Sequence, residues 1–162
     1  MATLKPVPFP HEKYGMFYVE EDLRDAAYRG DVQRMKTLLE QHPKLDVNAM
    51  NEYGETALYI ACKKNQNKAA DFLLEKADIK PNIQTILGNS PLLICAWNDN
   101  TELAKKLIAK GADINARTNP DREYHGNVSA LDIAQERNNT ALVEHLQKLA
   151  PAQAPQISAR PS

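Results

Sequence analysis

A pattern of apolar positions recurs four times along the chain. Leu23, Leu58, Leu92 and Leu131 occupy one position of the pattern, and they are 35, 34 and 39 residues apart. A second leucine column and a small-residue column keep the same intervals: Leu38, Leu73, Leu107 and Leu146, and Ala26, Ala61, Cys95 and Ala134. Three columns in one register indicate an internal repeat, with a period typical of stacked helical units.

Each repeat is predicted to form two short helices. In the second repeat, Leu58, Ala61 and Cys62 follow helical spacing, the polar segment 63–67 interrupts it, and apolar residues of 69–74 resume it. Segments rich in Asn and Gly separate the repeats and predict turns. The chain is therefore expected to be all-α.

The repeated unit resembles the ankyrin repeat, whose motif runs roughly D-x-x-G-x-T-P-L-H-x-A-A-x-x-G. The third repeat carries this motif through Gly88, Ser90, Pro91, Leu92, Cys95 and Ala96. The stretch "LIAKGADINA" (107–116) is similar to the family's helix-to-turn segment. The resemblance implies an all-α solenoid of about four helix-turn-helix units with turn or hairpin loops, in a small stand-alone ankyrin repeat protein.

One departure from the family motif concerns the turn between the two helices of a repeat. The family's glycine is kept only as Gly30, and Asn65, Asp99 and Asn138 replace it later. We expect the turn to survive, because Asn tolerates the left-handed backbone conformation better than most residues.

The repeats divide the chain into three predicted parts. Residues 1–19 are an N-terminal arm, partly packed on the first repeat through the aromatic side chains of 14–19 or, alternatively, free to bind a partner. Residues 20–150 form the repeat domain, with repeats at about 20–50, 51–83, 84–116 and 117–150. Residues 151–162 form a tail expected to be flexible. Asp25 and Gln135 place polar groups at otherwise apolar columns and predict capping repeats at both ends.

Composition and charge narrow the possible functions. The formal net charge of −1 gives no basic footprint for nucleic acid. The longest apolar run is far shorter than the ~20 residues of a membrane span, and prolines near the N-terminus do not suit a secretory signal. We expect a cytoplasmic monomer, or a periplasmic or secreted one if a signal has been removed. No motif for a cofactor is found, and the four histidines do not converge as metal ligands would, so neither cofactor nor metal is expected.

The two cysteines, Cys62 and Cys95, lie in neighbouring columns of successive repeats. Stacked helices are ~8–10 Å apart, which is too far for a disulfide. Both are therefore predicted to be buried, small apolar residues. An alternative function is a stress or redox accessory protein that uses these thiols.

The resemblance also implies a binding face. In ankyrin repeats the two positions after the small-residue pair lie at the end of the first helix, on the concave face, and the turn tips extend that face. The predicted partner-binding residues are Tyr28, Arg29, Glu52, Tyr53, Glu55, Lys63, Lys64, Ile86, Leu87, Trp97, Asn98, Tyr124, His125 and Arg137. Tyr, Trp and Arg dominate the energetic centres of interfaces. Alternatively, Trp97 folds back as local packing.

The predicted function is that of a non-catalytic interaction module for a folded protein of unknown identity. It binds through the concave face and turn tips, and it acts as a dedicated inhibitor or neutraliser or as an adaptor. The longer loop within 117–126 is expected to project from one face, often the binding one. An enzyme with an unrecognised site is the remaining alternative, because no acids, bases or nucleophiles are seen to converge.

Overall fold

A computed structural model of the chain describes residues 15–120 and 126–150. The described residues form helices and turns, and the one β-contact among them is an isolated bridge between Arg117 and Ser129. The all-α prediction is confirmed. The chain divides between Lys80 and Pro81 into two compact units, and each is described by itself.

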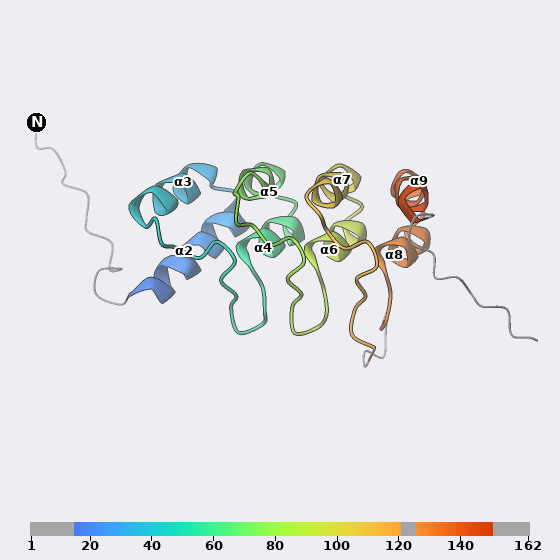
Figure 1. Ribbon diagram of the computed structural model, residues 1–162, viewed down its shortest axis with the longest axis horizontal. Helices are drawn as coiled ribbons and strands as arrows, with labels where there is room; N and C mark the ends of the chain where they lie inside the picture. The colour runs from blue at the N-terminus through green and yellow to red at the C-terminus, as the bar shows by residue number, and fades with distance from the viewer. Residues whose placement is uncertain (1–14, 121–125, 151–162) are drawn as a thin grey trace, which may run out of the picture. The chain divides into compact units, whose positions relative to one another are not determined.

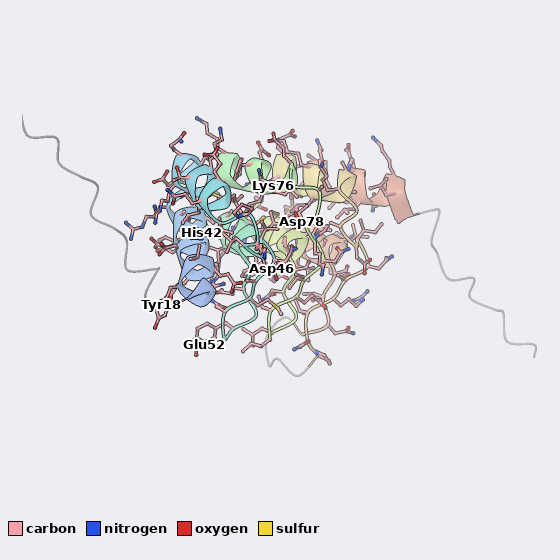
Figure 2. The ribbon with its side chains drawn as sticks, turned by 60° about the vertical axis from the view of Figure 1, so that its left-hand side comes forward. Tyr18, His42, Asp46, Glu52, Lys76 and Asp78 are labelled. Carbon is pink, nitrogen blue, oxygen red and sulfur yellow. The ribbon has the colours of Figure 1, made fainter. Side chains whose placement is uncertain are left out.

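Unit 1 contains two helix pairs. They are α2 (Met16–Arg29) with α3 (Val32–Gln41), and α4 (Ala57–Lys63) with α5 (Asn67–Leu74). Within this unit α2 packs against α3 and α4, and α5 packs against α4 and α3 (Figure 1). The turn between α3 and α4 projects away from the helices, and Figure 2 shows Glu52 near its far end.

Unit 2 repeats this arrangement with α6 (Pro91–Trp97), α7 (Thr101–Ala109), α8 (Ala130–Glu136) and α9 (Thr140–Leu149). Here α6 packs against α7 and α8, and α9 packs against α8 and α7. The small-residue column is buried in both units. The leucine columns are buried as predicted, with the exception of Leu131, which is half-buried. This leucine lies on α8, which is the first helix of the last helix pair in the described part of the chain.

Side chains at the helix starts explain where the helices begin. Thr56, Ser90 and Ser129 precede α4, α6 and α8, and each hydroxyl accepts a hydrogen bond from a backbone N–H of the first turn. Asn100 and Asn139 cap α7 and α9 in the same way. Such caps satisfy backbone donors that have no partner inside the helix.

The turn inside each helix pair requires a left-handed residue. Gly30, Asn65, Asp99 and Asn138 have φ angles of 73°, 55°, 56° and 57°. The substitutions for glycine therefore preserve the turn, as predicted, because Asn and Asp tolerate this conformation better than other side chains.

One asparagine in each unit ties a long turn to the turn after it, and Asn48 is buried whereas Asn82 is exposed. In unit 1 the Asn48 side-chain amide donates to the carbonyl of Asp78 at 2.9 Å, and its oxygen accepts from the Lys80 N–H at 2.8 Å. In unit 2 Asn82 makes the same two contacts, at 2.9 and 2.7 Å, with the turn after α7. These asparagines therefore pair backbone groups in addition to starting their turns.

Cys62 and Cys95 form no disulfide in the described part of the chain, and both are fully buried, which confirms the prediction that they are buried residues. Among the described helices, none combines the length and the apolar character that crossing a membrane would require. The helix α2 begins at Met16, so the last residues of the predicted arm 1–19 belong to it. Within that stretch Val19 is buried and Tyr18 is exposed. Residues 1–14 and the predicted tail lie outside the described part.

Candidate functional site

The tip of the first long turn is held in shape by one asparagine side chain. The Asn51 side-chain oxygen accepts hydrogen bonds from the backbone N–H groups of Tyr53 and Glu55, at 3.0 and 2.9 Å. The Asn51 amide group donates to the Glu55 carboxylate at 3.0 Å. Gly54, with φ of 75°, completes the turn. This bracing leaves the side chain of Tyr53 on the surface, with the residue 55% exposed.

Glu55 also joins the tip to α4. Lys63 Nζ lies 2.8 Å from Glu55 Oε1. Burial raises the pKa of Glu55, but hydrogen bonds from Lys63 and Asn51 and the charges of Lys63 and Lys64 outweigh it, so the pKa is lowered. The hydrogen bond to Glu55 raises the pKa of Lys63 in turn. Both shifts favour the charged forms of the pair.

The lowered pKa of Glu55 predicts a pH-dependent stability. A carboxyl whose pKa falls on folding stabilises the protein above its unfolded pKa, and this contribution disappears as the pH falls through the folded pKa. We expect wild type to exceed Glu55→Gln by about 0.5–1 kcal/mol in unfolding free energy near pH 7. The difference should vanish as the pH falls below the lowered pKa of Glu55, and it should persist at moderately alkaline pH, because the raised pKa of Lys63 keeps the lysine charged. Urea denaturation at several pH values measures this difference in unfolding free energy. A difference that does not change with pH would contradict the lowered pKa of Glu55.

Two further predicted residues of unit 1 meet at the end of α2. Lys64 Nζ lies 4.6 Å from the centroid of the Tyr28 ring, a cation–π contact, and Tyr28 is 50% exposed. Arg29 turns back to Asp25, with Nε 2.9 Å from the carboxylate. Five of the predicted residues of unit 1 therefore form local contacts with neighbouring side chains: Tyr28, Arg29, Glu55, Lys63 and Lys64.

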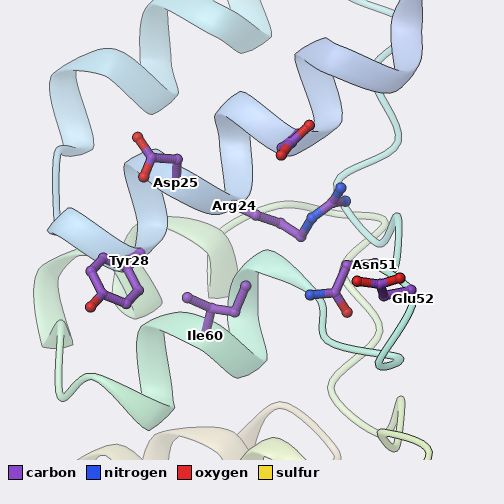
Figure 3. Close-up of a pocket in the computed structure, with 7 residues that line it drawn as sticks. Arg24, Asp25, Tyr28, Asn51, Glu52 and Ile60 are labelled. Atoms are coloured by element: carbon purple, nitrogen blue, oxygen red, sulfur yellow. The ribbon is translucent and has the colours of Figure 1, made fainter.

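A pocket of about 440 Å³ lies between α2, the first long turn and α4 (Figure 3). Its lining residues are Glu21, Arg24, Asp25, Tyr28, Asn51, Glu52 and Ile60. Tyr28 and Glu52 were predicted from the sequence, and the other five were missed.

A sequence signal for part of this lining was present. Glu21, Arg24 and Tyr28 follow one another at spacings of three and four residues, so they share a face of α2. That face is polar, so the apolar stripe predicted from the sequence does not include Glu21 or Arg24.

In unit 2 the tip of the next long turn is exposed. Ile86 is 60% exposed and Leu87 is 42% exposed. The Asn119 side chain donates to the Ile86 carbonyl at 2.9 Å, and the Asn119 backbone N–H donates to that of Leu87 at 3.3 Å. The backbone of this tip is therefore anchored while its apolar side chains remain at the surface.

The remaining predicted residues of unit 2 lie around the end of α6. Trp97 and Asn98 are half-buried, so the indole is neither sealed in the core nor fully exposed. Arg137 donates to the Asp99 carboxylate through Nε and Nη2, at 3.0 and 2.6 Å, which raises the pKa of Arg137 and lowers that of Asp99.

Two predicted residues, Tyr124 and His125, lie outside the described residues. The predicted binding face includes residues of both units, so it stays a prediction as a whole. No cluster of three or more potential metal ligands occurs within 15–120 and 126–150.

Comparison with known proteins identifies the repeated unit. The family profile described as "Ankyrin repeats (3 copies)" matches residues 23–118. The chain is 28% identical over 151 residues to "Inactive serine/threonine-protein kinase TEX14" of Bos taurus, a match covering 92% of the chain and 10% of the relative. It is 32% identical over 99 residues to a "Putative ankyrin repeat protein" of Rickettsia felis, covering 60% of the chain and 32% of the relative. It is 31% identical over 130 residues to "Osteoclast-stimulating factor 1" of Sus scrofa, a match covering 80% of the chain and 56% of the relative.

The matched regions span about a tenth of the bovine relative and about a third of the rickettsial one. The family profile covers more than half of this chain, and the helix pairs of both units follow its repeat. The chain belongs to the ankyrin repeat family.

Proposed function

We propose that this chain is a non-catalytic module that binds a folded protein through its turn tips and the C-terminal ends of α2 and α4. Ankyrin repeats are generally protein–protein interaction modules. The observation that carries the proposal is the tip at Asn51–Glu55. The Asn51 side chain accepts hydrogen bonds from two backbone N–H groups of the tip and donates a third to the Glu55 carboxylate, and Tyr53 remains on the surface.

A braced tip favours binding for two physical reasons. A loop already held in one conformation loses little entropy when it meets a partner. Tyrosine supplies a large contact area with few rotatable bonds, and it is enriched among the residues that dominate binding energy. The charged side chains beside it, Glu52 and the Glu55–Lys63 pair, form a polar rim of the kind that surrounds protein interfaces.

The more specific role that we propose is that of a dedicated inhibitor or neutraliser. A module that covers a partner's surface through fixed tips blocks that surface without performing chemistry. The buried thiols of Cys62 and Cys95, which form no disulfide in the described part of the chain, suit a reducing compartment such as the cytoplasm. If the partner is an enzyme, a stoichiometric loss of its activity on binding supports this role, and full activity in the complex supports an adaptor.

Replacement of Tyr53 by alanine should test the binding surface. Partners are captured from a lysate of the source organism and identified, and binding is then measured by calorimetry with purified proteins. We expect Tyr53→Ala to weaken binding by about 2 kcal/mol, or about 30-fold, because a central tyrosine contact is removed. The unfolding midpoint should hardly change, since Tyr53 is 55% exposed.

The matched control is Lys68→Ala, an exposed position at the start of α5. It should leave both affinity and midpoint unchanged. Unaltered affinity in Tyr53→Ala, with the purified partner still bound, would show that the tip is not the contact surface.

A further inference from the structure

We infer that the pocket beside α2 receives a basic side chain of the partner, while Arg24 donates a hydrogen bond to a neighbouring backbone carbonyl of the same partner segment. This inference rests on the proposed function, because it names the chemistry that the partner presents. It concerns the lining of the pocket, which shares Glu52 with the tip but does not include Tyr53.

The first observation is a pair of carboxylates that have no cation. Glu21 and Glu52 line the pocket, from α2 and from the turn tip. Neither forms an ion pair with any residue of the described part of the chain. The third lining carboxylate, Asp25, already pairs with Arg29 at 2.9 Å. Negative charge is therefore available on two sides of the cavity for a positively charged group.

The second observation is independent and concerns Arg24. This residue is only 6% exposed, and Figure 3 shows it reaching from α2 toward the turn that carries Asn51 and Glu52. Its one hydrogen bond to a described residue runs from Nη1 to the carbonyl of Ala49, at 3.3 Å. A guanidinium has five N–H donors, and buried donors without acceptors are costly. The remaining donors therefore favour an acceptor brought by a ligand.

The lining decides which acceptor fits. Three carboxylates share the cavity with Arg24, so a phosphate or a carboxylate ligand would meet net repulsion. A neutral acceptor avoids this repulsion, and a protein segment carries one at every residue as its backbone carbonyl. A segment with a basic side chain satisfies both the carboxylates and Arg24 at once.

The walls of the pocket suit such a side chain. Tyr28 and Ile60 supply apolar surface from α2 and α4, against which the methylene stem of arginine or lysine packs while its charged end reaches the carboxylates. The volume of about 440 Å³ accommodates one long side chain with part of its backbone.

The test uses a blocked tripeptide, acetyl-Gly-Arg-Gly-amide, as the probe. The full chain is labelled with ¹⁵N, and amide signals are followed as the peptide is added to well above a millimolar Kd. We expect saturable shifts centred on Glu21, Tyr28 and Glu52. The same peptide with citrulline, which is neutral and nearly the same shape, should bind at least about tenfold more weakly. Equal shifts with both peptides, or no saturable shifts in these signals with either, would overturn the inference.

Variants separate the contribution of the carboxylates Glu21 and Glu52 from that of Arg24. Glu21→Gln with Glu52→Gln should abolish the preference for arginine over citrulline, and added salt should weaken it in wild type. The control double variant, Glu40→Gln with Glu75→Gln, makes the same charge change at exposed sites outside the pocket and should keep the preference. Arg24→Met should weaken the citrulline peptide, because it removes the carbonyl contact, and it should weaken the arginine peptide less, because it also removes a positive charge beside the carboxylates. A circular dichroism melt checks that each variant is folded, and a control variant that loses the preference would contradict the site.

The purified partner distinguishes this inference from the proposed function. If the Gln double variant binds the partner as wild type does while Tyr53→Ala does not, the pocket inference fails and the proposed surface stands. If the peptide binds in the pocket but Tyr53→Ala leaves partner binding intact, the proposed tip surface fails and the pocket stands.

Discussion

Leu73→Ala is expected to lower the free energy of unfolding by about 2–5 kcal/mol. Leu73 lies on α5 and is completely buried. Its helix packs against both α3 and α4, so truncation leaves a cavity within unit 1. The lost transfer energy of the removed carbons and the cavity itself add to the cost. Because folded domains are stable by only about 5–15 kcal/mol, a loss of this size shifts the denaturation midpoint strongly.

Urea denaturation followed by circular dichroism measures the Leu73 effect, and Lys68→Ala on the same helix is the control. Lys68 is exposed, so its replacement should change stability by less than about 0.5 kcal/mol. A Leu73→Ala protein as stable as the Lys68→Ala protein would mean that α5 does not pack as described.

Gly88→Ala is expected to destabilise unit 2 by more than about 2 kcal/mol. Gly88 has a φ of 75°, which costs an L-residue about 1–2 kcal/mol. In addition, a Cβ at this position would lie 2.5 Å from the backbone nitrogen of Asn119. That backbone cannot move freely, because its N–H and side chain hold the carbonyls of Leu87 and Ile86. The tip and its anchor would therefore have to separate.

Gly111→Ala isolates the conformational part of this cost. Gly111 has a φ of 88°, but a Cβ there would meet no atom within 4 Å. It should lose only the about 1–2 kcal/mol of the left-handed conformation. Thermal unfolding of both variants provides the comparison. Equal losses would show that the contact between Gly88 and Asn119 is easily relieved.

The helices were predictable because burial on a helix repeats with the helical period. The columns of Leu58 and Ala61 place apolar groups on one side of each helix, so the amino-acid sequence is enough to locate the packed faces. The left-handed turns at Asn65 and Asn138 were predictable for a similar reason, since few residues tolerate that backbone conformation. Leu131 departs from its column, because it is half-buried on α8 while the other three leucines of the column are buried.

The pocket could not be predicted in the same way. It depends on the long turn lying against α2, where Arg24 reaches the Ala49 carbonyl across 25 positions of sequence. The hydrogen bonds that Asn51 accepts come from backbone N–H groups. Nearly every residue type has such a group, so the sequence does not show which residues supply them. Of the predicted binding residues, Tyr53 and Ile86 are strongly exposed, whereas Trp97 is half-buried. Partial burial of an indole depends on side-chain packing that spacing does not encode.

The bracing of the first turn separates two tasks among adjacent residues. Asn51, Gly54 and Glu55 set the backbone path, while the side chains of Glu52 and Tyr53 take no part in that hydrogen bonding. Mutations at positions 52 and 53 can therefore alter which molecule is recognised at little cost to folding. Evolution, or a designed library confined to these two codons, can retarget the loop while its scaffold stays the same.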